Sequence, residues 1–319
     1  MAAALLLLTL LSAGRSGPSD PPARPVEGEH FVYHVSDPGY MEVATRTLEE
    51  VRGRLSRLLG DSLPYKPAIH VVDEQQYFDE LIGGKFPDWG AGAAVSQRRL
   101  IAVKSPRNFN LSRSLAELLA HEYAHLVTAH KTGLRSSPRW FDEGLAMYVS
   151  MEWGWSDNLA MSKAAVFGQF LDLGEIENVN RFQEGKAHLA YAQAYLAVAF
   201  MVDNYSERSL GVFLEEIGAG KTESEALYQA TGSTREEFAS DFKLHLNRRF
   251  NVVSLFMDTI FFWLGLALIA VVAAFLRFRR RRQYYREWEK QERLHSTDFD
   301  YGDPERPEEI PDDDEPWRA

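Results

Sequence analysis

The feature that most constrains this chain is a pair of histidines one helical turn apart in an apolar stretch. His121, Glu122 and His125 lie in the run Leu-Ala-Glu-Leu-Leu-Ala-His-Glu-Tyr-Ala-His, and residues 111–132 contain neither Gly nor Pro. Residues four apart in an α-helix share one face, so both imidazoles can face a single metal ion. Glu122 lies beside that pair, where a carboxylate can accept a proton from an attacking water molecule.

A second motif supplies a third ligand. Gly133 and Pro138 interrupt the first helical pattern, and Trp-Phe-Asp-Glu-Gly-Leu-Ala, residues 140–146, opens another. Glu143 in this motif completes three protein ligands and leaves a fourth position open, as in catalytic rather than structural zinc sites. The alternative is two histidines packed in a core, with Glu143 an ordinary surface acid. That alternative does not explain why the second motif follows the first at a sequence distance that lets Glu143 reach the same metal ion.

His-Glu-x-x-His followed by Trp-x-x-Glu-Gly-x-Ala resembles the gluzincins, the zinc metallopeptidases whose third ligand is a glutamate on the next helix. The small peptidase-MA-like domains look most similar, and thermolysin and the zinc aminopeptidases are more distant. The likeness covers roughly residues 60–250. It implies that His121, His125 and Glu143 bind one Zn²⁺ ion and that Glu122 is the general base and acid.

A further segment, Ala-Tyr-Ala-Gln-Ala-Tyr at residues 190–195, is similar to the Tyr-x-Gln-Ser or Tyr-x-Lys-Gly segment of these families. There the first tyrosine hydrogen-bonds the oxyanion of the tetrahedral intermediate, so the resemblance implies this role for Tyr191. Tyr195, one turn further on the same face, is the alternative. Aromatic packing in an apolar helix would also account for both tyrosines.

The expected fold is an α+β, zincin-like domain in which a small mixed sheet precedes helices and the metal-binding helix lies at their junction. Strands are predicted at residues 29–35, 68–72 and 93–103. In the related zincins, a strand directly before the metal-binding helix forms the sheet edge to which an extended peptide is added. Ser233 and Glu236 have the spacing of a capping box for the last helix. Apolar periodicity predicts the remaining helices at residues 40–59, 74–82, 140–151, 156–171, 187–205, 209–217, 223–230 and 234–250.

Composition excludes several kinds of site. The chain has 319 residues and no cysteine, which rules out disulfides, cysteine-rich zinc sites and thiol nucleophiles. Most of the net charge of −11 is carried by the acidic residues 298–319, so it says little about the substrate. The basic cluster after residue 276 follows an apolar stretch and is expected to attract anionic lipid rather than nucleic acid.

The two ends of the chain carry signals of their own. Residues 1–14 are predicted to be a signal peptide and residues 15–28 a proline-rich linker, followed by an extracytoplasmic domain at residues 29–250. The charge-free part of residues 252–276 predicts a transmembrane helix in contact with lipid. The arginines that follow predict that residues 277–319, a basic and then acidic disordered tail, lie in the cytoplasm. The expected location is therefore the cell membrane, with a single pass.

The predicted function is a membrane-anchored zinc metallopeptidase that hydrolyses a peptide or protein substrate. The zinc aminopeptidases grip the substrate's α-amine with a Gly-x-Met-Glu-Asn segment, whereas residues 90–94 offer no carboxylate. An endopeptidase is therefore favoured over an aminopeptidase. The alternative is a catalytically inactive zincin-fold binding or scaffold protein, or a sensor that acts through its cytoplasmic tail.

Overall fold

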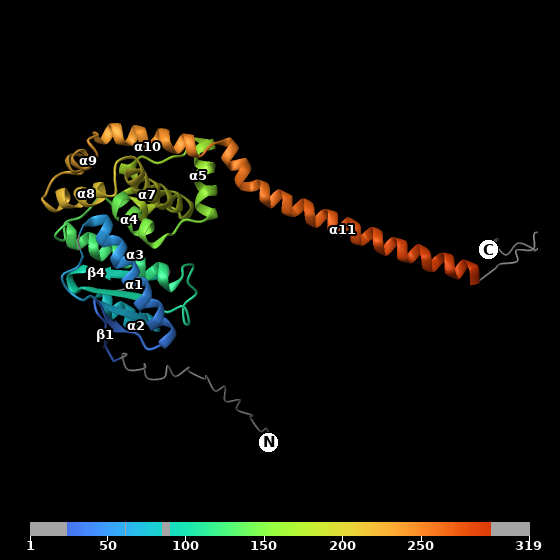
Figure 1. Cartoon of the computed structure of the whole chain (residues 1–319), viewed down its shortest axis with the longest axis horizontal. Coiled ribbons are helices and arrows are strands. Elements are labelled where there is room, and N and C mark those ends of the chain that lie inside the picture. Colours follow the sequence, from blue (N-terminus) through green and yellow to red (C-terminus); the bar gives the residue numbers. More distant parts are fainter. Residues whose placement is uncertain (1–23, 61, 85–89, 295–319) are drawn as a thin grey trace, which may run out of the picture. The chain divides into compact units, whose positions relative to one another are not determined.

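The computed structural model describes residues 24–60, 62–84 and 90–294. The chain divides into two units, Met1–Asp258 and Thr259–Ala319. In the first unit, helices alternate with the strands of a five-stranded sheet, and a longer run of helices follows the last strand (Figure 1). The predicted fold class, an α+β domain followed by a transmembrane helix, is therefore corrected to a mixed α/β domain with a small sheet and helices.

The sheet is small and mixed, as predicted. Its strands lie in the order β1-β2-β3-β5-β4. The three inner strands run parallel, and the two outer strands pair antiparallel with their neighbours. The strands are β1 (Val26–Glu27), β2 (Val32–His34), β3 (Ala68–Val72), β4 (Gly92–Val95) and β5 (Leu100–Lys104).

Helices cover both faces of the sheet. Helices α1 (Pro38–Leu59) and α3 (Leu115–Lys131) pack on one face and α2 (Gln75–Ile82) packs on the other. Every residue of β5 is therefore buried, with Ile101 and Val103 in the main core and Leu100 and Ala102 in the smaller cluster with α2. Strands covered on both faces have continuous apolar sequences, and β5 reads Leu-Ile-Ala-Val-Lys.

The helical half packs around α7 (Glu184–Asn204). Helix α4 (Arg139–Ser150) approaches α7 so closely that a Cβ atom on Gly144 would lie 2.3 Å from the backbone oxygen of Ala194. Only glycine fits at this contact. The other helices of this half are α5 (Trp155–Phe167), α6 (Leu173–Ile176), α8 (Arg208–Gly218), α9 (Glu223–Thr231) and α10 (Arg235–Arg249).

Three local details differ from the sequence prediction. Residues 93–103 form a hairpin rather than one strand, because Arg99 adopts a left-handed conformation (φ 56°) after a short 3₁₀ turn and reverses the chain. Strand β1 lies inside the predicted linker 15–28 and pairs with β2. The capping box of α10 uses Thr234 and Glu237, one residue later than predicted.

The predicted transmembrane helix at residues 252–276 is wrong, and so is the single-pass location in the cell membrane. Among the residues that the structure describes, no helix combines the length and the apolar character needed to cross a membrane. The lipid contact implied by that prediction has no support either. Residues 252–276 belong to a longer helix, α11 (Val252–Leu294).

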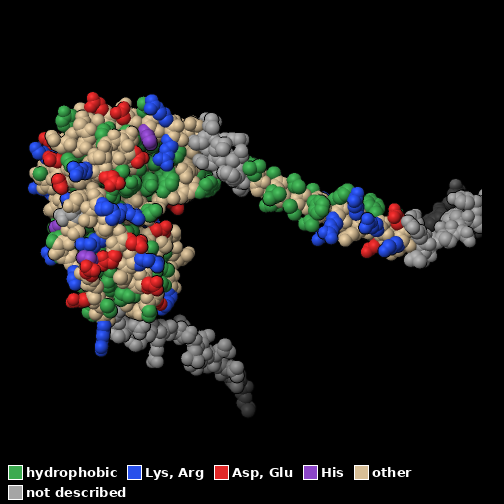
Figure 2. Space-filling model, viewed as in Figure 1, with side chains coloured by type: hydrophobic (Ala, Val, Ile, Leu, Met, Phe, Trp, Pro, Cys, Tyr) green, Lys and Arg blue, Asp and Glu red, His purple; other side chains and the backbone are tan. Residues whose placement is uncertain are grey.

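Helix α11 also extends through part of the predicted disordered tail. Its described side chains change in character along the helix: hydrophobic residues precede a cluster of arginines that begins at Arg277, and mixed charges follow (Figure 2). The predicted signal peptide, residues 1–14, and the acidic residues 298–319 lie outside the described part of the chain.

Candidate metal centre

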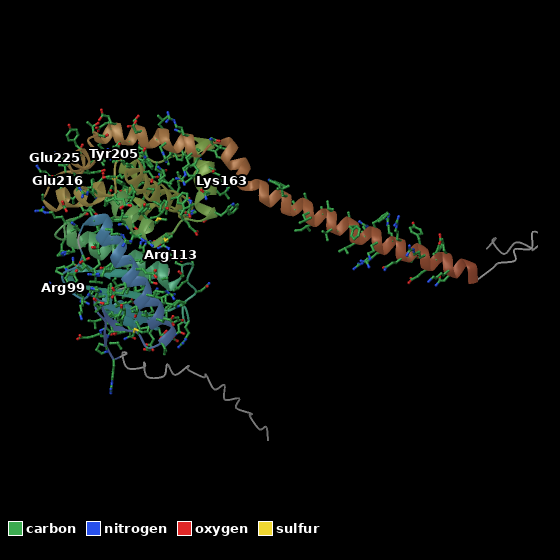
Figure 3. All side chains as sticks on the ribbon, viewed as in Figure 1. Arg99, Arg113, Lys163, Tyr205, Glu216 and Glu225 are labelled. Carbon is green, nitrogen blue, oxygen red and sulfur yellow. The ribbon has the colours of Figure 1, made fainter. Side chains whose placement is uncertain are left out.

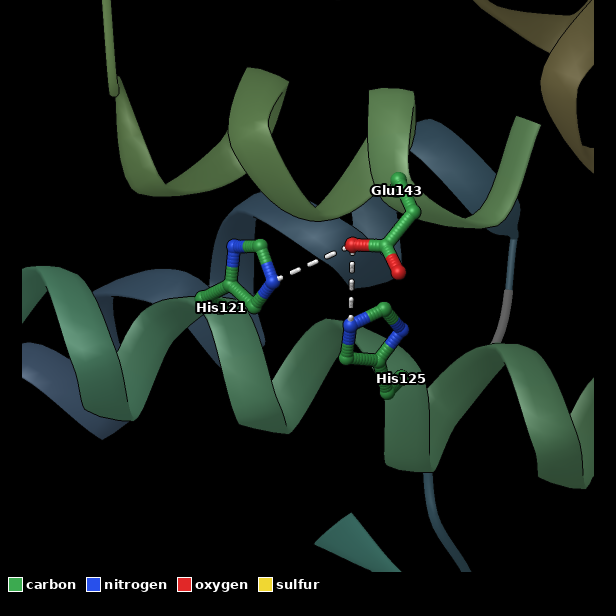
Figure 4. Close-up of side chains that lie close together, drawn as sticks. All are labelled: His121, His125 and Glu143. Carbon is green, nitrogen blue, oxygen red and sulfur yellow. Dashed lines mark ion pairs between the residues drawn. The ribbon is translucent and has the colours of Figure 1, made fainter. Parts of the chain in front are cut away.

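The three predicted ligands converge between two helices. His121 and His125 project from α3, and Glu143 reaches them from α4 (Figure 4). One ligand atom from each residue lies within 4.8 Å of the others. Oε2 of Glu143 is 3.6 Å from Nε2 of His121 and 3.8 Å from Nε2 of His125. Helical spacing places the two imidazoles on one face, and the packing of α4 on α3 adds the carboxylate.

This donor set fits zinc. Two imidazole nitrogens and one carboxylate oxygen are ligands that zinc accepts, and atoms ~2.0–2.2 Å from a tetrahedral ion lie about 3.4 Å apart. The two measured separations between nitrogen and oxygen are close to this value. The side chains of His121 and Glu143 are only 7% and 11% exposed, so they leave little room for a loosely held hydrated ion.

Each histidine is held from behind by a carboxylate. Nδ1 of His125 lies 3.1 Å from Oδ2 of Asp142, and Nδ1 of His121 lies 3.0 Å from Oε1 of Glu152. A carboxylate oxygen at Nδ1 keeps the proton on that nitrogen and leaves the lone pair of Nε2 available to a metal. Both imidazoles therefore present the same atom to the cluster.

The pKa values of two side chains in the cluster are strongly shifted. Burial raises the pKa of Glu143, but a hydrogen bond to His121 and the nearby charges outweigh burial and lower that pKa to about 2. Burial lowers the pKa of His125, yet the adjacent carboxylate of Asp142 raises it to about 10. Protons and a metal ion compete for the same imidazole nitrogens, so metal uptake at such a site releases protons.

Glu122 is buried beside the ligands and under the sheet edge. A Cβ atom on Gly92, the first residue of β4, would lie 2.8 Å from Oε1 of Glu122. Burial raises the pKa of Glu122, and the charges of His125 and His121 oppose that effect. The predicted general base therefore lies next to the predicted ligands and against the strand at the sheet edge.

The two candidate tyrosines have different surroundings. Burial and the negative charge of Glu143 raise the pKa of Tyr191, and a hydrogen bond with Arg139 lowers it. Tyr195 instead stacks on Trp153, with ring centroids 4.8 Å apart. Tyr191 thus shares the electrostatic environment of the cluster, whereas Tyr195 belongs to an aromatic contact.

Sequence comparison covers all three helices of this site. The family model of the Peptidase MA superfamily matches residues 54–247. The chain belongs to the Peptidase MA superfamily. This membership confirms the predicted resemblance to the peptidase-MA-like gluzincins and indicates a metallopeptidase-like protein, whose peptidase domain implies a peptide or protein substrate. A search of curated proteins finds no match to the chain.

Three side chains around this Peptidase MA site were missed by sequence reasoning. Asp142 directly precedes Glu143, and Arg139 lies one turn before it, so helical spacing could have indicated both. Glu152 follows the end of α4, and its contact with His121 depends on how the chain turns there. No local pattern in the sequence predicts that turn.

Proposed function

We propose that this member of the Peptidase MA superfamily is a zinc-dependent metallopeptidase in which His121, His125 and Glu143 hold the ion. When bound, zinc polarises the scissile carbonyl and lowers the pKa of a water molecule towards ~7. The observation that carries the proposal is the convergence of three ligand atoms within 4.8 Å of one another. Glu122 lies next to them, so both the ligand set and the candidate base are intact.

Glu122 is proposed as the general base and then the general acid. Its carboxylate takes a proton from the attacking water and donates it to the leaving amine. A base is most effective when its pKa approaches the working pH, and burial shifts the pKa of Glu122 upward, in that direction.

Tyr191 is proposed to stabilise the oxyanion of the tetrahedral intermediate. Its hydroxyl group donates a hydrogen bond to the oxygen on which negative charge develops. Support comes from its position: Glu143 and Arg139 are among the groups that influence its pKa. The charge of a proposed metal ligand therefore influences this hydroxyl, which supports a role for Tyr191 in the same site.

The proposed mode of cleavage is that of an endopeptidase. Strand β4 is an edge strand that pairs only with β5 among the described residues, and Gly92 places it beside Glu122. An extended substrate that adds to this edge continues past the scissile bond in both directions. Residues 90–95 contain no acidic side chain that would bind a free α-amine and restrict cleavage to a terminus.

The test measures zinc content and hydrolysis of a mixed peptide library by the purified full chain. We expect one zinc ion per chain in the wild type and in Glu122→Gln, and a loss of zinc in His125→Ala. Glu122→Gln should lower turnover by at least about 100-fold, the size of a general-base contribution.

The matched control is His130→Ala, because His130 also lies on α3 but packs against Tyr65. That variant should keep both zinc and activity. Equal zinc content in His125→Ala and the wild type would rule out this metal centre. A zinc-loaded wild type that cleaves no peptide would instead favour the inactive binding or scaffold alternative.

A further inference from the structure

Glu152 is a buried carboxylate next to the metal cluster but outside both sequence motifs. Its side chain is only 8% exposed. Oε1 accepts hydrogen bonds from Nδ1 of His121 at 3.0 Å and from Oγ of Ser150 at 2.7 Å. Oε2 lies 3.1 Å from Nε of Arg113, whose side chain is partly exposed. Both oxygens of the carboxylate are therefore occupied by donors.

The contact between Glu152 and His121 determines which imidazole nitrogen is free. A carboxylate only accepts hydrogen bonds, so Nδ1 of His121 must carry a hydrogen. Nε2, which lies 3.6 Å from Glu143, is then the nitrogen whose proton a metal ion would displace and whose lone pair the ion would take. Because the Nδ1 contact also defines the plane of the ring, Glu152 sets both the tautomer and the orientation of His121.

The backbone after α4 is shaped to make this contact. Met151 ends α4 in a left-handed conformation with φ 61°, which residues with a Cβ atom disfavour. The side chain of Met151 is 67% exposed, so burial of that side chain does not compensate for the conformation. The N–H of Glu152 donates a hydrogen bond to the backbone oxygen of Met147 in this turn. The turn places the side chain of Glu152 against His121 of α3.

Arg113 holds Glu152 from the solvent side. It belongs to the segment just before α3, where the sheet half of the domain meets the helical half (Figure 3). Among the described residues, Glu152 is the only acidic side chain that forms an ion pair with Arg113. Burial raises the pKa of Glu152, but the hydrogen bond from His121 and the positive charge of Arg113 outweigh burial and lower that pKa.

We propose that Glu152 is a positioning residue for the metal centre: it fixes His121 as a ligand through Nε2, and Arg113 secures Glu152 in place. The inference rests on the proposed function, because it takes His121 as a zinc ligand. Loss of such a contact behind a ligand weakens metal affinity by ~10–100-fold.

A second contact between a carboxylate and a histidine, that of Asp157 with His188, provides a control for general stabilisation of the fold. Asp157 is also a buried carboxylate, and it lies 2.8 Å from Nε2 of His188, which is not one of the three residues of the cluster. It also accepts a hydrogen bond from the N–H of Gly154 at 2.8 Å. Removal of Asp157 therefore breaks a partly buried contact between a carboxylate and a histidine without changing a proposed metal ligand.

The experiment compares the zinc affinity of the full-length wild type, Glu152→Ala, Glu152→Gln and Asp157→Ala by competition with a chromogenic chelator. Glu152→Ala should raise the Kd for zinc by about 10–100-fold, and Asp157→Ala should leave it unchanged. Glu152→Gln should fall between the wild type and Glu152→Ala, since its amide oxygen still accepts from Nδ1. Thermal unfolding of the zinc-free proteins shows how much stability each variant has lost.

The outcomes distinguish the inference from the proposed function. If the wild type binds zinc and both Glu152 variants bind it equally well, the positioning role is wrong and the metal centre stands. The same holds if Glu152→Ala and Asp157→Ala lose affinity equally. If the wild type binds no zinc, the proposed function fails, and the inference fails with it. Glu152→Gln has nearly the shape of the native residue and decides the matter if Glu152→Ala does not fold.

Discussion

Arg139 and Glu143 lie one turn apart on α4, and their contact decides which carboxylate oxygen faces the histidines. Nη2 of Arg139 lies 3.0 Å from Oε1 of Glu143, so Oε2 is the atom that points to both imidazoles. The same guanidinium lies close enough to Tyr191 to lower the pKa of its hydroxyl group. One side chain thus links the third ligand to the proposed oxyanion donor.

At this scale we predict a kinetic effect of Tyr191→Phe. The hydroxyl acts only when the oxyanion forms, so kcat and kcat/KM should fall together by ~10²–10³, or about 3–4 kcal/mol, while KM stays nearly constant. Steady-state kinetics on one cleaved peptide measures this split.

Tyr195→Phe is the matched control, because phenylalanine keeps the stacking on Trp153. Its kinetics should remain close to those of the wild type. A large loss in Tyr195→Phe together with normal activity in Tyr191→Phe would move the oxyanion role one helical turn along α7.

At the scale of elements, the fit of β4 against α3 depends on a missing side chain. Gly92 begins β4 opposite Val103 of β5, and its Cα lies against the carboxylate of Glu122. The edge of the sheet can therefore approach the side of α3 that carries Glu122, the proposed base, without displacing its carboxylate. The strand and the helix meet closely only because this position is glycine.

We predict that Gly92→Ala keeps zinc but loses activity. The added Cβ would lie 2.8 Å from Oε1 of Glu122, and the flexible end of that side chain is the part that moves. A displacement of about 1 Å at a catalytic group costs ~10²-fold in rate, so kcat should fall by up to that factor.

Gly185→Ala on α7 is the control, since a Cβ atom there meets nothing within 4 Å. It should retain the kcat of the wild type. Full activity in Gly92→Ala would show that β4 does not constrain the base.

At the scale of the whole domain, parallel strand pairing brings together side chains that are distant in the chain. His34 on β2 and His70 on β3 are in register, and their rings stack with centroids 4.2 Å apart and an interplanar angle of 8°. Burial and the neighbouring charge of His34 lower the pKa of His70 to about 4. The folded domain therefore disfavours a proton on His70.

This pair predicts a loss of stability in acid. The unfolded chain binds a proton at His70 below its ordinary pKa of 6.5, whereas the folded domain resists protonation until about pH 4. The contribution of His70 is thus complete above pH 6.5 and decreases as the pH falls to 4, by about 3 kcal/mol in total.

The measurement is urea unfolding of the full chain between pH 7.5 and 4, with a chelator present to keep the metal centre empty. His70→Gln does not titrate and should lose less stability than the wild type over this range. Since the other titrating groups are common to both proteins, the difference between their curves isolates His70. Parallel curves would contradict the assignment.

The spacing of residues along the chain predicts several features of the fold and of the candidate site. The relation between His121 and His125 is set by the helical repeat alone, and Glu143 was recognised from its motif. The pattern of apolar residues also predicted the main helices. The hairpin around Arg99 was missed, since neither Gly nor Pro marks that left-handed turn. The membrane helix was wrongly predicted from a short charge-free run within α11.

The sequence by itself therefore determined the family, the small mixed sheet before the helices, and the residue types of the metal cluster. Only the tertiary structure decided how α4 lies on α3, and with it the 3.6 and 3.8 Å separations between Glu143 and the histidines. It also decided that Glu152, which is distant from His121 in the sequence, contacts Nδ1 of that histidine. In addition, it decided that the pKa of Tyr191 responds to the charge of Glu143, whereas Tyr195 stacks on Trp153. The physical reason is that helical periodicity acts within one element, whereas these contacts depend on turns and packing between elements.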